Sequence, residues 1–241
     1  MKKLQKSLKN HKYICFLDFE GTQFSHEMIA FGALFVTIDK NGNIKRKKPS
    51  IKYYVKAKNK IGKFVEGLTG IHEDTLTRVG IPFSRALREI KRYCGLNFKR
   101  TTFMTFGNHD LKILNQSVAY NLDSPKELAG VIQKNYLDFQ ALISEFVKDD
   151  NSNAYSLENY LKVFNLEFDG TAHDPEYDAI NLGRLYQAFI SNKGKLLEEY
   201  LKVLSKLRHI PSPLSKAAQK LASGQDVSGE EFKNWAEEDL L

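Results

Sequence analysis

The chain has 241 residues, of which 42% are hydrophobic and 27% charged, a composition typical of a globular protein with one sizeable domain. Lysine and arginine number 36 against 29 acidic residues, and the net charge of +7 modestly favours a polyanionic partner. With Cys15 and Cys94 as the only cysteines, a disulfide framework and a paired-cysteine zinc site are excluded, and a cytoplasmic location fits.

Strand patterns dominate the first half of the chain. Residues 13–17 are nearly all apolar and predict a central strand buried on both faces. Residues 28–38 and 51–57 are rich in β-formers, and residues 39–43 between them have turn chemistry, so we expect an antiparallel meander that pairs with the first strand. Residues 101–106 predict a fourth strand.

Helical spacing of apolar residues appears after the meander. Pro82 lies near the start of the first such pattern and Gly95 at its end, as helix punctuation requires. Strands first and helices interleaved afterwards predict an α/β fold with a mixed sheet. The expected helices cover residues 82–94, 110–120 and 138–147, a segment that opens at Ser156, and residues 178–190 and 193–207.

Four acidic residues stand out by their positions. Asp18 and Glu20 end the buried strand, and alternation along a strand places both carboxylates on one face, where they could hold a hard cation. Asp110 lies at a loop-to-helix junction after the fourth strand, and Asp178 opens the long apolar helix, with His173 in the loop before it. Each residue alone is most simply a solvated surface residue; their conjunction predicts a site.

This set contains the parts of a two-metal phosphodiesterase site. Such a site needs carboxylates that converge from different elements, two cations about 3.5–4 Å apart and a base for water. A histidine suits the base because its unperturbed pKa of about 6.5 lies near working pH. The other five histidines we interpret as loop residues: His11, His26, His72, His109 and His209.

Three motifs carry a resemblance to a known family. Residues 16–22 (Phe-Leu-Asp-Phe-Glu-Gly-Thr), 106–110 (Phe-Gly-Asn-His-Asp) and 173–179 (His-Asp-Pro-Glu-Tyr-Asp-Ala) resemble, in order and spacing, the motifs of the DEDDh (DnaQ-like) 3′–5′ exonucleases of the ribonuclease H-like fold. The similarity covers roughly residues 13–190. Stretches between the motifs are most similar to the KapD and Eri-type branch of exoribonucleases, namely residues 27–33, 64–71 and 157–166.

The resemblance implies a fold and a set of roles. The fold would be a mixed sheet of about five strands flanked by helices, with a helical C-terminal extension. Two Mg²⁺ or Mn²⁺ ions would be bridged by Asp18 and further held by Glu20 and Asp178, with Asp110 acting directly or through water. His173 would take the proton from the attacking water.

The resemblance also implies substrate contacts. The backbone at Gly21 and Thr22 would lie near the last nucleotide, and Leu68 would pack on the terminal bases. The chain departs from the family at His109, where an aromatic residue is usual, and at Pro175-Glu176, where Ala-Leu is common. Neither departure removes a ligand, so they bear on packing and nucleotide preference.

These patterns predict three segments: a basic N-terminal segment (1–12), an exonuclease domain (13–192) and a helical C-terminal extension (193–241). The expected partner is single-stranded nucleic acid, RNA rather than DNA on the branch resemblance alone, with no membrane partner because no apolar stretch is long enough to span one. Two alternatives stay open. One is a DNA-directed exonuclease of the proofreading or repair type, and the other is a non-catalytic nucleic-acid-binding module that uses its basic surface.

Overall fold

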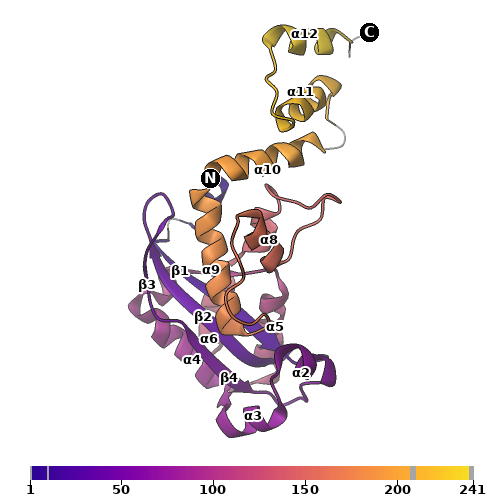
Figure 1. Cartoon of the computed structure of the whole chain (residues 1–241). Helices are drawn as coiled ribbons and strands as arrows, with labels where there is room; N and C mark the ends of the chain where they lie inside the picture. Colours follow the sequence, from indigo (N-terminus) through magenta and orange to yellow (C-terminus); the bar gives the residue numbers. More distant parts are fainter. Residues whose placement is uncertain (1, 10, 207–209, 239–241) are drawn as a thin grey trace.

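The structure, a computed structural model, describes residues 2–9, 11–206 and 210–238. Its centre is a seven-stranded mixed sheet in the order β5-β4-β2-β1-β6-β7, with β3 also paired to β2 (Figure 1). The α/β class and the mixed sheet are as predicted. The strands are β1 (Tyr13–Gly21), β2 (Met28–Ile38), β3 (Ile44–Lys47), β4 (Ile51–Lys56), β5 (Ile81–Pro82), β6 (Thr101–Thr105) and β7 (Tyr136–Asp138).

Helices flank the sheet on both faces, and the last three extend away from it (Figure 1). The helices are α1 (Lys2–Ser7), α2 (Lys63–Thr69), α3 (Glu73–Val79), α4 (Phe83–Cys94), the 3₁₀ helix η1 (Gly95–Arg100), α5 (His109–Tyr120), α6 (Lys126–Lys134), α7 (Phe139–Ile143), α8 (Leu157–Val163), α9 (Pro175–Ser191), α10 (Lys193–Ser205), α11 (Ser212–Ala222) and α12 (Gly229–Glu238). Among the described residues, no helix has the length and apolar character that crossing a membrane requires.

The predicted meander and its pairing with the first strand are confirmed. β1 pairs with β2 antiparallel and with β6 parallel, and β2 pairs with β4 antiparallel. Side chains of β1 alternate between two cores, with Phe16 in the core under α9 and Leu17 in the core under α4. Asp18 and Glu20 continue the alternation of Phe16, so both project on the α9 face of the sheet.

The sheet has more strands than the expected number of about five. The additional strands are β3, β5 and β7, which have only four, two and three residues. A strand this short shows no alternation that a sequence pattern could detect, and its pairing is decided by the neighbouring long strand.

Several helix boundaries also differ from the expectation. The helix predicted over 138–147 is only α7, which ends at Ile143, and the helix predicted to open at Asp178 begins at Pro175 after the N-cap Asp174. Helices α2, α3 and α6 have seven to nine residues and were not predicted. Short helices depend on tertiary contacts more than on their own periodicity.

The two ends of the chain are helical where described. In the N-terminal segment, Leu4 and Leu8 are buried and join the core under α9. At the other end, α10 covers most of the helix predicted over 193–207, while its last predicted residue, Leu207, lies outside the described residues. Leu196 of α10 also joins the core, so both terminal segments are attached to the sheet by apolar contacts.

The packing of α9 on the sheet depends on Gly32 of β2. A Cβ atom at this position would lie 1.8 Å from the carbonyl oxygen of Pro175 and 2.4 Å from the backbone nitrogen of Glu176, distances that backbone atoms cannot tolerate. Gly32 pairs with Asp18 in the sheet register. The absent side chain therefore lets the first turn of α9, which carries Asp178, lie directly beside Asp18.

We expect Gly32→Ala to destabilise the protein strongly. The added methyl group forces α9 off the sheet, and overpacking of this kind costs about 1–3 kcal/mol or more. For a chain of this size each kcal/mol lowers the melting temperature by about 2–4 °C. The matched control is Gly130→Ala in α6, where a Cβ meets nothing within 4 Å and should stabilise the helix by up to about 1 kcal/mol. Equal melting temperatures for the two variants would contradict this account.

Candidate active site

A cleft of about 740 Å³ opens at the carboxyl end of β1. Residues from β1, α2, α5, α7, α8, α9 and the loops between them form its walls. All of the residues that the sequence suggested for a site are among those that line this cleft: Asp18, Glu20, Gly21, Thr22, Leu68, Asp110, His173 and Asp178. Tertiary structure thus brings into one cavity residues that are up to 160 positions apart in the chain.

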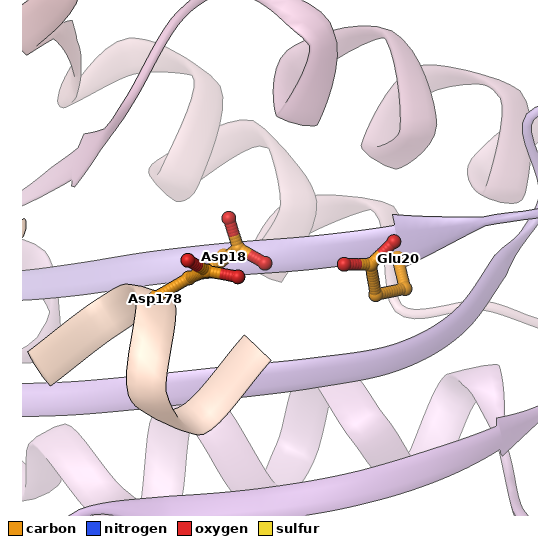
Figure 2. Close-up of side chains that lie close together, drawn as sticks. All are labelled: Asp18, Glu20 and Asp178. Atoms are coloured by element: carbon orange, nitrogen blue, oxygen red, sulfur yellow. The ribbon is translucent and has the colours of Figure 1, made fainter. Parts of the chain in front are cut away.

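Three of these carboxylates form a compact cluster. Oxygen atoms of Asp18, Glu20 and Asp178 all lie within 4.8 Å of one another. Asp18 and Glu20 project from the same strand, and Asp178 reaches toward Asp18 from the first turns of α9 (Figure 2). The alternation predicted for β1 and the helical position of the third carboxylate therefore combine in one cluster.

The start of α9 is tied to β4 by polar contacts that fix Asp178. Asp174 is the N-cap of α9, accepting a hydrogen bond from the Glu176 backbone N–H at 3.0 Å. Its other carboxylate oxygen forms an ion pair with Lys52 Nζ at 2.6 Å. Two residues further along, Glu176 accepts a hydrogen bond from the Ser50 hydroxyl at 2.6 Å. These contacts, together with the close approach at Gly32, determine where Asp178 lies.

Asp110 lies in the cleft but outside this cluster of three. It is buried in the first turn of α5, and its Oδ1 accepts a hydrogen bond from the Phe19 backbone N–H at 2.7 Å. This bond joins α5 to the strand between Asp18 and Glu20. One carboxylate oxygen of Asp110 is therefore engaged in structure, and the other is available to the cleft.

The buried carboxylates raise one another's pKa. Burial, followed by the charges of Asp110, Asp178 and Glu20, raises the pKa of Asp18 well above its usual range. Burial and the charge of Asp178 raise the pKa of Glu20 to about 8. Burial also raises the pKa of Asp110 and of Asp178 to about 7, although backbone N–H groups donate to both.

The electrostatic character of the cleft fits a divalent cation. Among the described residues that line it there is no lysine or arginine, so the carboxylate charges have no protein cation within the cavity. Oxygen ligands gathered at this density are what hard cations such as Mg²⁺ bind. A bound divalent cation would supply the missing positive charge and would lower the pKa of the ligating carboxylates.

His173 contacts the carboxylate cluster through its backbone. Its φ of 61° lies in the left-handed region, which few residues other than glycine adopt. The backbone N–H of His173 donates to the carboxylate of Asp178. The side chain is exposed in the wall of the cleft, so the imidazole is accessible to solvent and to a bound molecule.

The predicted substrate-contacting residues differ in what they offer. At Thr22, the N–H donates to Glu27 O (2.8 Å), the carbonyl accepts from the His26 N–H (3.1 Å), and the hydroxyl accepts from the Glu27 N–H (2.9 Å). Thr22 therefore shapes the cleft wall without a free polar group. Gly21 has no room for a side chain, because a Cβ would lie 2.9 Å from Ile113 Cγ1.

The glycine in residues 68–71 (Leu-Thr-Gly-Ile) predicts a loop, but Leu68 lies on α2. Its side chain is 42% exposed. One turn before it, Phe64 is 67% exposed and also lines the cleft. Residues four apart lie on the same side of a helix, so Phe64 and Leu68 form an apolar surface at the cleft rim. Phe64 was not singled out from the sequence, where only its spacing to Leu68 could have indicated it.

Two histidines interpreted as loop residues also line the cleft. His109 is the first residue of α5, and its ring meets that of His26 edge-on with centroids 5.2 Å apart. Lys112 Nζ donates to His26 Nε2 at 2.8 Å. Burial and the charge of Lys112 lower the pKa of His26. The loop interpretation of His109 is therefore wrong, because the residue before the motif aspartate starts the helix.

The fold and the site together define a nuclease of the ribonuclease H-like class. Residues 15–186 match the model of the exonuclease family named after RNase T, and the chain belongs to that family. The family predicted from the three motifs is thereby confirmed, and the chain is an exonuclease. No curated protein matches the sequence.

Solved structures share the fold at low sequence identity. The nuclease domain of 3′hExo, a DEDDh family member bound to rAMP, is 22% identical over 76% of this chain and 94% of that one, with a TM-score of 0.59. Cell-death related nuclease 4 (CRN-4) is 20% identical over 76% of this chain and 65% of that one, also at 0.59. Exonuclease I of E. coli, in complex with a dA16 oligonucleotide, is 16% identical over 81% and 44%, at 0.59.

We expect Glu20→Gln to stabilise the metal-free protein at alkaline pH. The pKa of Glu20 is raised on folding, so the native state retains its proton and stability falls as the pH rises from the unfolded pKa of about 4.3 through the folded pKa of about 8. A glutamine at this position does not ionise, so the variant does not lose stability in this way as the pH rises. Thermal unfolding in EDTA should show the variant melting several degrees higher at about pH 8.5, with the difference disappearing near pH 4.

The matched control is Glu230→Gln on α12, an exposed glutamate without a partner in the described residues. Its melting temperature should follow the wild type across the whole pH range. If Glu20→Gln instead melts below the wild type at about pH 8.5, burial and repulsion by the neighbouring carboxylates do not disfavour the charged form of Glu20.

Proposed function

We propose that the protein is a divalent-metal-dependent 3′–5′ exonuclease that releases 5′-mononucleotides from the 3′ end of single-stranded nucleic acid, RNA in preference to DNA. The observation that carries the proposal is the cluster of Asp18, Glu20 and Asp178 in the cleft, with Asp110 and His173 in the same walls. The membership of the chain in the exonuclease family supports the proposed type of reaction.

The positions of the residues support the roles that the family resemblance implies. Asp18, Glu20 and Asp178 would hold the cations, two Mg²⁺ or Mn²⁺ ions in the two-metal scheme, with Asp110 as the fourth carboxylate. The cations, when bound, neutralise phosphate charge and promote formation of hydroxide from water. His173 is accessible in the cleft wall and accepts the proton of the attacking water. Leu68 and Phe64 provide an apolar surface for the terminal bases.

The RNA preference rests on the resemblance to the KapD and Eri-type branch. Among the neighbours in fold, 3′hExo is bound to rAMP, and a second neighbour is a 3′-exonuclease in 3′-end specific recognition of a histone mRNA stem-loop. Exonuclease I is bound to DNA oligonucleotides. Proteins with this fold are therefore found bound to RNA components and to DNA. A DNA-directed exonuclease is the second candidate function.

Purified protein should shorten a 5′-labelled single strand one nucleotide at a time in Mg²⁺ or Mn²⁺, and EDTA should stop the reaction. Asp18→Asn is expected to lower kcat by roughly a thousandfold or more, because loss of a metal-ligating carboxylate removes transition-state charge stabilisation. His173→Ala is expected to lower it by about a hundred- to ten-thousandfold, the usual contribution of a general base. Gel analysis of the labelled products measures both effects.

The matched control is His72→Ala, since His72 is an exposed histidine at the N-cap of α3 outside the cleft. This variant should retain wild-type turnover. Unchanged turnover by Asp18→Asn would refute the site assignment. Strand binding without cleavage in Mn²⁺ by the wild type would favour the non-catalytic binding module.

A side-by-side assay on RNA and DNA strands of the same sequence decides the substrate. We expect a higher kcat/KM for the RNA strand, since a protein separates the two sugars by contacts to the 2′-hydroxyl. A higher kcat/KM for the DNA strand would select the second candidate. Duplex versions of both strands should be degraded more slowly because the terminal base pair must first open.

A further inference from the structure

The outer face of α4 is entirely basic. Every fully exposed residue of this helix is an arginine or a lysine, and they are Arg85, Arg88, Lys91 and Arg92. Its apolar side chains, Phe83, Leu87 and Ile90 among them, are buried against the sheet. Because the apolar face is already covered, α4 can meet a partner only through charge.

Residues 83–100, which form α4 and η1, carry a surplus of positive charge. They contain six basic residues and one acidic residue, a net charge of +5. The single acidic residue, Glu89, has a side chain only 7% exposed and forms ion pairs with Arg85, at 3.5 Å, and with Arg92. Glu89 therefore orders two guanidinium groups without exposing negative charge.

The remaining basic groups have no acidic partner. Arg88, Lys91, Lys99 and Arg100 are exposed, and no ion pair or side-chain hydrogen bond engages them within the described part of the chain. Along the helix, Arg85 and Arg92 are separated by about 10 Å at 1.5 Å per residue. That distance corresponds to about three successive phosphates of one strand at 3.4 Å each.

The cleft itself has the opposite character. The described residues that line the cleft include carboxylates but no lysine or arginine. The phosphates beyond the cleaved nucleotide therefore meet no lysine or arginine side chain in the cleft walls. The carboxylates lie on the α9 face of the sheet, and α4 packs on the other face, as the two separate cores show (Figure 1). A surface that holds the rest of the strand must therefore lie outside the cleft.

We propose that α4 and η1 form a second nucleic-acid-binding site, the α4 basic face, defined by Arg85, Arg88, Lys91, Arg92, Lys99 and Arg100. It binds the phosphate backbone of the substrate upstream of the 3′ end. Helix and sheet layers are each about 10 Å thick, so the path from the cleft to α4 is on the order of 30 Å, or about ten stacked nucleotides. This inference rests on the proposed function, because the polyanion is the substrate of the nuclease.

The test is a fourfold variant that keeps the Glu89 ion pairs: Arg88→Gln, Lys91→Gln, Lys99→Gln and Arg100→Gln. Fluorescence anisotropy in EDTA measures binding of a labelled single strand of about 30 nucleotides, which stays intact without metal. We expect an affinity loss of about tenfold or more, and a slope of log K against log salt that is smaller by about 3, since each contact to a single strand contributes about 0.7.

The matched control removes the same charge from exposed lysines that lie on neither α4, η1 nor the neighbouring α6: Lys40→Gln, Lys45→Gln, Lys193→Gln and Lys233→Gln. It should retain most of the affinity. Hydrolysis of a strand of about four nucleotides in Mg²⁺, too short to reach α4, should be unchanged in both variants and also shows that they are folded. If the fourfold variant does not fold, the double variant Arg88→Gln and Lys91→Gln should lower the slope by about 1.4.

Equal affinity losses in the two variants would overturn the proposal. A second outcome would also overturn the proposal. If the fourfold variant keeps full strand binding but loses binding to phosphatidylserine vesicles, the α4 basic face binds a membrane surface instead. Failure of the nuclease proposal is distinguishable: wild-type protein would then hydrolyse no strand, while selective loss of binding by the fourfold variant would still support the α4 basic face.

Discussion

The close approach of α9 to β2 at Gly32 is the constraint on which the site depends. A Cβ at this position would overlap the carbonyl oxygen of Pro175, so only glycine lets the helix backbone touch the strand. Since Gly32 pairs with Asp18 across the sheet, the same contact brings Asp178 beside Asp18. The ion pair of Lys52 with the N-cap Asp174 adds a polar contact between β4 and the start of the helix.

This arrangement gathers carboxylates that repel one another. Burial and mutual repulsion raise the pKa of Glu20 to about 8 and the pKa of Asp178 to about 7, so at neutral pH the metal-free cleft holds protons that exposed carboxylates would have lost. A divalent cation bound there would relieve that repulsion. Cation binding and folding stability would then be linked through the same side chains. The first-turn carboxylate of α5, Asp110, is held to β1 and keeps its place without the cation.

Charge is divided between the two faces of the sheet. The α9 face carries the carboxylates of the cleft, and the α4 face carries the six basic residues of α4 and η1. A sheet core with side chains alternating to the two faces keeps these opposite charges apart, so neither neutralises the other. In this arrangement the 3′ end of a nucleic-acid strand would be hydrolysed on the α9 face of the sheet, while the phosphate backbone of the same nucleic acid is bound on the α4 face.

The sequence by itself determined the long strands, the long helices of the sheet domain and eight of the residues that line the cleft, because alternation, helical spacing and the three motifs are local signals. β1, β2 and α9 were predicted from such patterns, as were Asp18, Glu20 and Asp178. Only the tertiary structure decided the short elements, the engagement of every polar group of Thr22, the place of Phe64 at the cleft rim and the close approach at Gly32. Each of these depends on contacts between segments far apart in the chain, which no local pattern records.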